Sequence, residues 1–258
     1  MSLTQLSRSI DGLVAVITGA GSGMGAATAK LFADQGAKVA ALDLNEASVA
    51  GVVQEITAAG KSAKAWQIDL ADGDAIVRVM TEIAEHFNGI DLLVNNAGIS
   101  MPAPIDRDGY EEAWGLSLAV LLTAQQRTIR AALPHLRQSD NPRIVNIAST
   151  EGLGATKGGS PYTAAKHGVI GLTRSLAVEL GGEGITVNCI CPGPINTGMT
   201  QAIPDEQKLV YARRRVALKR YAEPEEVAHG TLNFCLPSSS FMTGTALPVD
   251  GGLTIKNA

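Results

Sequence analysis

The sequence Leu13-Val14-Ala15-Val16-Ile17-Thr18-Gly19-Ala20-Gly21-Ser22-Gly23-Met24-Gly25 lies near the N-terminus of a 258-residue chain. Its first six residues are apolar or β-branched, as in a short buried strand. Four glycines follow, and a helical pattern runs on to about residue 35. Strand, glycine-rich turn and helix predict a dinucleotide-binding unit, because glycine lets the backbone approach a pyrophosphate and the helix N-terminus offers it free N–H groups. A flexible loop, the alternative, does not explain the flanking strand and helix.

A second predicted strand, residues 38–42, ends at Asp43. In dinucleotide-binding units an acid at about this spacing binds the adenosine ribose hydroxyls. A 2′-phosphate there would carry about −1.5 to −2 charges. Repulsion between like charges at ~4 Å reaches ~4 kcal/mol at an effective dielectric near 20. No Arg or Lys lies in residues 20–24 or just after Asp43. The sequence therefore predicts NAD(H) over NADP(H), unless Asp43 is only a solvated loop acid.

The segment Ser160-Pro161-Tyr162-Thr163-Ala164-Ala165-Lys166 places a phenol and an ammonium four residues apart. On a helix these positions share one face. A positive charge beside a phenol favours the phenolate, so we expect the pKa of Tyr162 to fall from ~10 toward neutrality. The pair would then act as a general acid/base near neutral pH. Alone, this spacing is also typical of an ordinary helix with an exposed lysine.

Together these motifs make the sequence similar to the short-chain dehydrogenase/reductase family, over roughly residues 13–253. The spacing Thr18–Gly19–Gly23–Gly25 matches the family's TGxxxGxG, and residues 95–98 match its NNAG. Ser149 precedes Tyr162 by 13 residues, as the family's catalytic serine does. Residues 192–193 and 197 match the segment around the nicotinamide, and residues 250–252 match the C-terminal signature.

The resemblance implies an NAD(H)-dependent oxidoreductase that interconverts a secondary alcohol and a ketone, with a small-molecule substrate and a homotetrameric assembly. The hydride passes to or from the cofactor. Tyr162 would be the general acid/base, Ser149 would bind the substrate oxygen, and Lys166 would stabilise the phenolate. The residues expected to bind the cofactor are Gly19, Ser22, Gly23, Met24, Gly25, Asp43, Leu44, Asp69, Leu70, Asn95, Ala97, Gly98, Tyr162, Lys166, Pro192, Gly193, Ile195 and Thr197.

One position departs from the family pattern. The family commonly has an Asn in the long helix before the serine strand, where it helps to hold a water that links the lysine to solvent. Alignment on Trp114 places Leu121 there, and no Asn occurs between Ala97 and Asp140. Ser117, four residues earlier, is our hypothesis for a substitute. The alternative is a catalytically impaired NAD(H)-binding sensor or partner subunit. An epimerase or dehydratase using the same residues is a further alternative.

Strands and helices alternate along the whole chain, which implies a parallel sheet with helices on both faces. We predict an α/β, doubly wound (Rossmann-type) fold of three layers, α/β/α, with about seven strands, in a single domain of residues 1–258. Residues 194–221 read as a substrate lid. Ligands of such folds lie beyond the carboxyl ends of the strands. Polar or glycine residues follow five predicted strands at this edge: Gly19, Asp43, Asp69, Asn95 and Ser149.

Composition narrows the possible functions. A net charge of −4 and a pI of about 5.6 argue against a nucleic-acid partner. The longest apolar run is too short for a membrane span, and residues 1–10 are polar, without a signal region. The three cysteines cannot all pair and are expected to be buried, in a cytoplasmic protein without a metal site. Residues 213–215, three arginines, are interpreted as a solvated face, and Glu151 either lines the substrate pocket or is an exposed turn acid.

Overall fold

A computed structural model of the chain describes residues 5–257; Met1–Thr4, the start of the polar N-terminal segment, and Ala258 lie outside the described residues. Seven parallel strands form one sheet in the order β3-β2-β1-β4-β5-β6-β7. This order confirms the predicted doubly wound, Rossmann-type sheet. The strands are β1 (Val14–Thr18), β2 (Lys38–Asp43), β3 (Ala63–Gln67), β4 (Leu92–Asn95), β5 (Arg143–Ile147), β6 (Thr186–Pro192) and β7 (Ala246–Val249).

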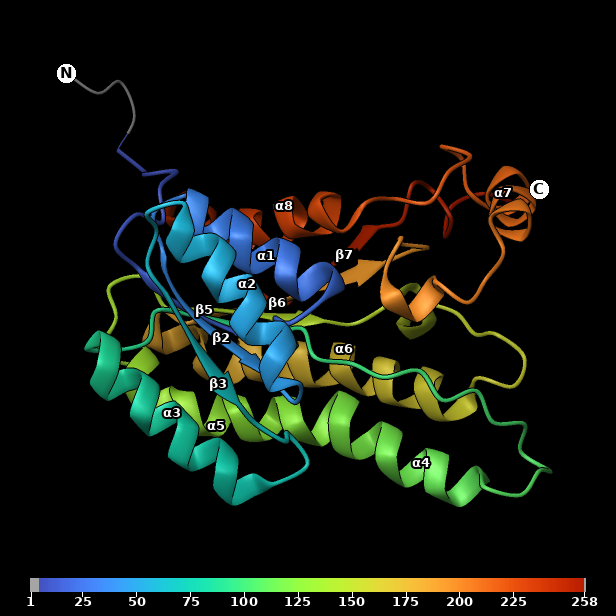
Figure 1. Cartoon of the computed structure of the whole chain (residues 1–258), viewed down its shortest axis with the longest axis horizontal. Coiled ribbons are helices and arrows are strands. Elements are labelled where there is room, and N and C mark those ends of the chain that lie inside the picture. The colour runs from blue at the N-terminus through green and yellow to red at the C-terminus, as the bar shows by residue number, and fades with distance from the viewer. Residues whose placement is uncertain (1–4, 258) are drawn as a thin grey trace.

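Helices cover both faces of the sheet, which confirms the three layers (Figure 1). One layer contains α1 (Gly23–Asp34), α2 (Glu46–Ala58) and α8 (Pro224–Cys235), and the other contains α3 (Gly73–Phe87), α5 (Ala124–Leu136) and α6 (Ser160–Leu180). Strand side chains alternate between the layers, because successive residues point to opposite faces. Ala15 and Ile17 pack into the core beneath α1, whereas Val16 packs into the core beneath α3.

Local sequence signals set several helix ends. The carboxylate of Asp72 accepts hydrogen bonds from the backbone N–H groups of Asp74 and Ala75 and so caps α3. At the start of α8, Pro224 occupies the first turn, and the side chains of Glu223 and Glu226 form a capping box. These local contacts explain why α3 begins after Asp72 and α8 begins after Glu223.

The long helix expected before the serine strand differs from a regular α-helix. It consists of α4 (Tyr110–Leu118), a π-helical turn η1 (Ala119–Thr123) and α5. This turn packs closely on α6, since a Cβ added to Gly168 would lie 2.7 Å from the Leu122 side chain. Hydrophobic periodicity does not reveal a single wider turn, which is why the sequence indicated one continuous helix. No described helix is both long and apolar enough to cross a membrane.

The short helical turn η2 (Thr150–Gly152), which follows Ser149, packs directly on α6. A Cβ on Gly152 would lie 2.8 Å from the carbonyl oxygen of Lys166 and 2.9 Å from the side chain of Ile170. We therefore expect Gly152→Ala to lower the free energy of unfolding by about 1–3 kcal/mol, through overpacking. Denaturant unfolding followed by circular dichroism measures this change.

Gly51→Ala is the matched control. Gly51 lies within α2, and a Cβ there meets no atom within 4 Å. Alanine in a helix interior is favoured over glycine by up to about 1 kcal/mol, so this variant should be at least as stable as the original protein. Equal stability of the two variants would contradict the close packing of η2 on α6.

Candidate active site

The predicted site residues gather at the carboxyl edge of the sheet. Gly19 follows β1, Asp43 ends β2, Asn95 ends β4, and Ser149 follows β5 by two residues. All four strands are parallel neighbours or near neighbours, so their carboxyl ends meet at one edge. The sequence therefore placed these residues on the correct edge.

The glycine turn after β1 is built for close backbone approach. Gly19 and Gly23 have positive φ values of 65° and 52°, which favour glycine. A Cβ on Gly25 would lie only 2.0 Å from the carbonyl oxygen of Gly19, and one on Gly19 would lie 2.7 Å from the Cα of Ala97. The turn leads into the N-terminus of α1, whose N-cap residue Ser22 makes no side-chain capping bond. The first N–H groups of α1 therefore suit the pyrophosphate of a dinucleotide.

Asp43 lies against this turn. One carboxylate oxygen, Oδ2, accepts a hydrogen bond from the backbone N–H of Gly21 at 2.8 Å, and Oδ1 accepts one from Asn45 at 2.9 Å. A carboxylate has about four acceptor positions, so hydroxyl donors can still bind it. Asp43 thus has a structural bond to the turn in addition to its predicted place beside a ribose.

Asn95 and Asn96 make side-chain hydrogen bonds at the carboxyl edge of the sheet that the motif alone did not reveal. Asn95 is buried; its side chain donates to Asn146 at 3.0 Å and accepts from Thr128 at 2.6 Å, so this side chain points into the protein. The Asn96 amide donates to the carbonyl oxygens of Thr18 and Gly19 and so fastens the glycine turn. Asn96 belongs to the NNAG motif, but the motif by itself does not indicate this structural role.

The structure brings Ser149, Tyr162 and Lys166 together. Ser149 is 9% exposed and its hydroxyl accepts a hydrogen bond from the N–H of Glu151. Tyr162 lies in the first turn of α6, and the Nζ atom of Lys166 is 5.5 Å from the centre of its ring. Lys166 is buried, and its ammonium donates to the carbonyl oxygen of Ile147 at 2.7 Å. This bond joins α6 to the end of β5.

The expected direction of the Tyr162 pKa is wrong for the protein alone. Burial raises the pKa of Tyr162; a hydrogen bond with Ser149 lowers it, and the charge of Glu151 raises it further. Burial also lowers the pKa of Lys166 from 10.5 to about 8, against the opposing effect of Cys191 and Cys189. Desolvation is the largest cause of both shifts, and a residue pattern does not measure desolvation.

The segment after β6 borders the glycine turn. Ile195 is buried, and a Cβ on Gly23 would lie 3.2 Å from the Thr197 side chain. Gly193 packs against the Asp250 backbone, since a Cβ there would lie 2.7 Å from the Asp250 Cα. Pro192 and Gly193, at the end of β6, and Asp69 and Leu70, after β3, also lie at the carboxyl edge of the sheet.

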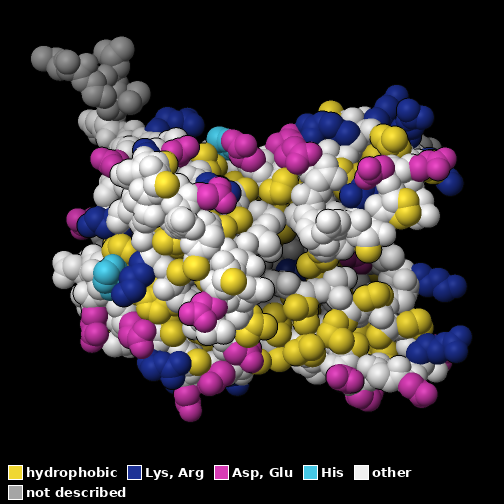
Figure 2. All heavy atoms as spheres, viewed as in Figure 1, with side chains coloured by type: hydrophobic (Ala, Val, Ile, Leu, Met, Phe, Trp, Pro, Cys, Tyr) yellow, Lys and Arg dark blue, Asp and Glu magenta, His cyan; other side chains and the backbone are white. Residues whose placement is uncertain are grey.

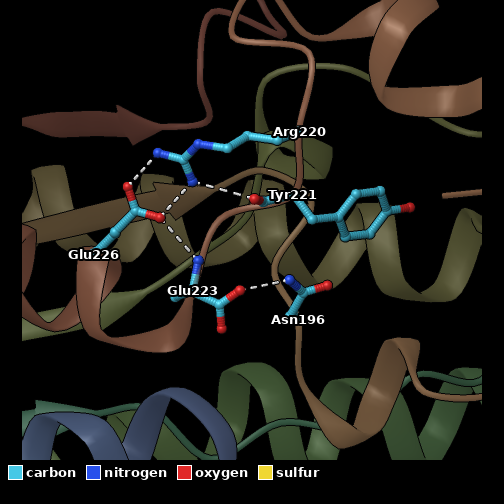
Figure 3. Close-up of polar contacts among 5 residues, drawn as sticks. All are labelled: Asn196, Arg220, Tyr221, Glu223 and Glu226. Carbon is cyan, nitrogen blue, oxygen red and sulfur yellow. Dashed lines mark hydrogen bonds and ion pairs between the residues drawn. The ribbon is translucent and has the colours of Figure 1, made fainter. Parts of the chain in front are cut away.

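The two ends of the segment between β6 and α8 are tied together (Figure 3). Ile195 and Ala222 form a parallel bridge, and the Asn196 amide donates to Glu223 at 2.7 Å. The guanidinium of Arg220 makes two hydrogen bonds of 2.6 Å to Glu226. This contact holds the pKa of Glu226 at about 2. The ties define the base of a loop that carries η4 (Gly198–Thr200) and α7 (Asp205–Arg215).

Leu121, which stands where the family commonly has an asparagine, is packed inside the protein. Leu121 lies in the π-turn η1 and is fully buried, and a Cβ on Gly98 would lie 3.4 Å from its side chain. Ser117 is also fully buried, and its hydroxyl has no hydrogen-bond partner among the described residues. The water-holding role suggested for Ser117 stays a prediction.

The structure also shows the positions of the remaining residues that the sequence pointed out. Glu151 is half-buried and accepts hydrogen bonds from the hydroxyls of Thr156 and Thr163, at 2.6 and 2.8 Å. The arginines at residues 213–215 are all exposed at the end of α7, which agrees with the solvated face expected from the sequence. The three cysteines are buried and free. Among the described residues, no cluster of three or more His, Cys, Asp or Glu could hold a metal.

Comparison with known proteins assigns the family. Residues 19–254 match a family model described as enoyl-(acyl carrier protein) reductase. A 3-oxoacyl-[acyl-carrier-protein] reductase from Thermotoga maritima is 37% identical over 246 residues, which cover 95% of this chain and 99% of that protein.

Two further relatives agree. The meso-2,3-butanediol dehydrogenase of Serratia marcescens is 38% identical, with 96% of each chain covered. A crystal structure from Beutenbergia cavernae, described as a putative NAD(P)-dependent gluconate 5-dehydrogenase with bound NADP at low occupancy, superposes with a TM-score of 0.90. It is 36% identical, and the match covers 96% of this chain and 99% of that one. With its glycine turn, its parallel sheet and these relatives, the chain belongs to the short-chain dehydrogenase/reductase family of nicotinamide-dependent oxidoreductases.

Proposed function

We propose that the chain is an NAD(H)-dependent oxidoreductase that interconverts a secondary alcohol and a ketone. The observation that carries this proposal is the convergence of Ser149, Tyr162 and Lys166 beside the glycine turn, with the Lys166 ammonium 5.5 Å from the Tyr162 ring. A dehydrogenase needs a bound nicotinamide, a group that positions the substrate oxygen and one matched proton donor or acceptor. The proposed residues supply the last two.

Each residue of this trio has a distinct role in the proposed mechanism. Tyr162 donates a proton to the substrate oxygen in reduction and removes it in oxidation. Ser149 donates a hydrogen bond to the same oxygen and orients it. Lys166 holds a positive charge near the phenol and stabilises its ionised form. The nicotinamide, when bound, supplies or accepts the hydride.

The choice of NAD(H) rests on Asp43. Its carboxylate lies against the glycine turn, and the next residues are Leu44, Asn45 and Glu46, none of them basic. A 2′-phosphate at this position would therefore meet a negative charge without a cation to offset it. The relative from Beutenbergia cavernae, by contrast, is described with bound NADP at low occupancy.

We propose residues 194–221 as the substrate lid of a single domain of residues 1–258. Support comes from the tied base of this segment and from α7, which projects away from the sheet (Figure 1). A homotetramer is proposed because apolar side chains gather around α4 and α6 (Figure 2), where Leu116 is 40% and Val178 is 86% exposed. Three free, buried thiols are compatible with a reducing cytoplasm.

A second candidate function is an NAD(H)-binding protein without turnover, acting as a sensor or partner subunit. Leu121 favours it, because leucine cannot hold the water that the family's asparagine helps to bind. Reduction of a carrier-linked 3-oxoacyl group, as the name of the Thermotoga maritima relative states, is a variant of the leading proposal. Absorbance of reduced nicotinamide, with a panel of secondary alcohols, ketones and 3-oxoacyl thioesters, separates the three.

Tyr162→Phe should reduce kcat by about 10²-fold or more, since it removes the proposed acid/base. NADH fluorescence titration should still show binding, because the glycine turn and Asp43 are unchanged in this variant. Tyr110→Phe is the matched control, because Tyr110 also loses a hydroxyl that hydrogen-bonds, at 3.0 Å, to Ser160. The proposed chemistry fails if Tyr162→Phe turns over as fast as this control.

Asp43→Ser should lower the ratio of kcat/KM for NAD to that for NADP by about 10²-fold, because it removes a like-charge repulsion of up to ~4 kcal/mol. Asp34→Ser, at the exposed end of α1, removes the same charge near the start of β2, at the opposite end of that strand from Asp43, and should leave the ratio unchanged. A wild-type preference for NADP would refute the role given to Asp43.

Lys166→Met tests the burial of the ammonium. The folded-state pKa of about 8 lies below the ordinary 10.5, so the unfolded chain binds more protons between these values. Wild-type stability relative to Lys166→Met should therefore rise by about 3 kcal/mol as pH increases from about 8 to about 10.5. Cys189, Cys191 and Tyr162 also face this site and remain in both proteins. Denaturation at several pH values measures the difference, and a constant difference would contradict a buried, charged lysine.

A further inference from the structure

The carboxylate of Glu151 lies beside the proposed catalytic residues without a cation to neutralise it. The backbone N–H of Glu151 donates a hydrogen bond to the Ser149 hydroxyl at 3.1 Å. Its carboxylate accepts a hydrogen bond from the hydroxyl of Thr163, the residue after Tyr162, at 2.8 Å. Among the described residues, Glu151 forms no ion pair. Its negative charge therefore acts on a molecule that binds to Ser149 and Tyr162.

Two threonine hydroxyls fix the direction of this carboxylate. Thr156 donates to Oε1 of Glu151 at 2.6 Å, and Thr163 donates to Oε2 at 2.8 Å. Thr156 follows η2 and Thr163 lies in the first turn of α6, so the carboxylate connects these two segments. A carboxylate has about four acceptor positions, which leaves about two of them free. Because the side chain is only half-buried, a small molecule can reach the free positions.

The charge of Glu151 acts on two phenols that belong to different segments. Burial raises the pKa of Tyr162, the hydrogen bond with Ser149 lowers it, and the charge of Glu151 raises it further. Burial also raises the pKa of Tyr211, the charge of Arg215 lowers it, and the charge of Glu151 raises it. Tyr162 belongs to the proposed catalytic trio, and Tyr211, in α7, belongs to the proposed lid. Glu151 is thus within electrostatic reach of both.

These charges indicate which substituent of a substrate is favoured. Glu151 would repel a carboxylate. An ammonium would be attracted by Glu151 but repelled by Arg215, whose charge also acts on Tyr211. A hydroxyl has no charge and can donate a hydrogen bond to the carboxylate, as the two threonine hydroxyls already do. Hydrogen bonds to a charged acceptor are stronger than those between neutral groups, so the arrangement favours a substrate hydroxyl.

We propose that Glu151 is a specificity-determining residue whose carboxylate accepts a hydrogen bond from a second hydroxyl of the substrate, beside the reacting carbon. This inference rests on the proposed function and narrows its substrates to vicinal diols and the α-hydroxyketones formed from them. In oxidation, the reacting carbon loses its hydrogen as hydride to NAD, its hydroxyl proton goes to Tyr162, and a C=O bond forms. The second hydroxyl keeps all its bonds and only orients the substrate, and reduction reverses these transfers.

The test compares four-carbon secondary alcohols that differ in one substituent. Wild-type kcat/KM should be about 10- to 100-fold higher for the preferred stereoisomer of 2,3-butanediol than for that of 2-butanol, as expected for a hydrogen bond to a charged group. Glu151→Gln keeps the length of the side chain but removes its charge, and should lower this ratio about tenfold. Glu151→Ala should lower it further. A wild-type preference for 3-amino-2-butanol or 3-hydroxybutyrate over the diol would overturn the inference.

Thr156→Val is the matched control. It removes one of the two hydroxyls that hold the carboxylate but leaves the charge of Glu151 and its contact with Thr163. The ratio of kcat/KM for the diol to that for 2-butanol should therefore change little. If Glu151 only fastened the loop, its variants would lower kcat/KM for both alcohols by the same factor. An unchanged ratio in Glu151→Gln and Glu151→Ala would overturn the inference.

Binding of the diol to the NADH complex tests Glu151 without turnover. NADH fluorescence should give a Kd for 2,3-butanediol about tenfold lower in the wild type than in Glu151→Gln, with the same circular dichroism spectrum for both proteins. A wild-type protein that shows this difference but turns over no alcohol or ketone would overturn the proposed function alone. Turnover without preference for the diol, together with equal Kd values, would overturn only the role given to Glu151.

Discussion

The hydrogen bond from the Lys166 ammonium to the carbonyl oxygen of Ile147 fixes the rest of the candidate site. It joins α6 to the end of β5 and places Tyr162 beside Ser149. Lys166 is buried, and the carbonyl oxygen of Ile147 accepts a hydrogen bond from its ammonium and so stabilises the charge. Burying a cation destabilises the folded state unless the cation is hydrogen-bonded. The folded state therefore depends on this contact.

The sheet connects this hydrogen bond to the other residues at the carboxyl edge. Parallel pairing of β1, β4 and β5 aligns their carboxyl ends, and Asn95, Asn96 and Asn146 connect those ends through side-chain hydrogen bonds. The glycine turn can approach Ala97 because no Cβ lies between them. The proposed cofactor cradle and the proposed proton-transfer group are thereby held at one edge of the sheet by the same hydrogen-bond network.

This arrangement also explains why Leu121 is compatible with an intact trio. The π-turn still packs against Gly98 and α6, so its apolar side chain preserves the shape of the wall. Close packing of this stretch of helix therefore does not require an asparagine at residue 121.

The sequence by itself determined the doubly wound sheet, the edge where Gly19, Asp43, Asn95 and Ser149 gather, and the family, because hydrophobic periodicity and motif spacing are local properties of the chain. Only the tertiary structure decided the raised pKa of Tyr162, the π-turn around Leu121, the inward direction of Asn95 and the ties between Arg220 and Glu226. These features depend on burial and on contacts between distant segments, and neither desolvation nor packing can be read from the order of residues.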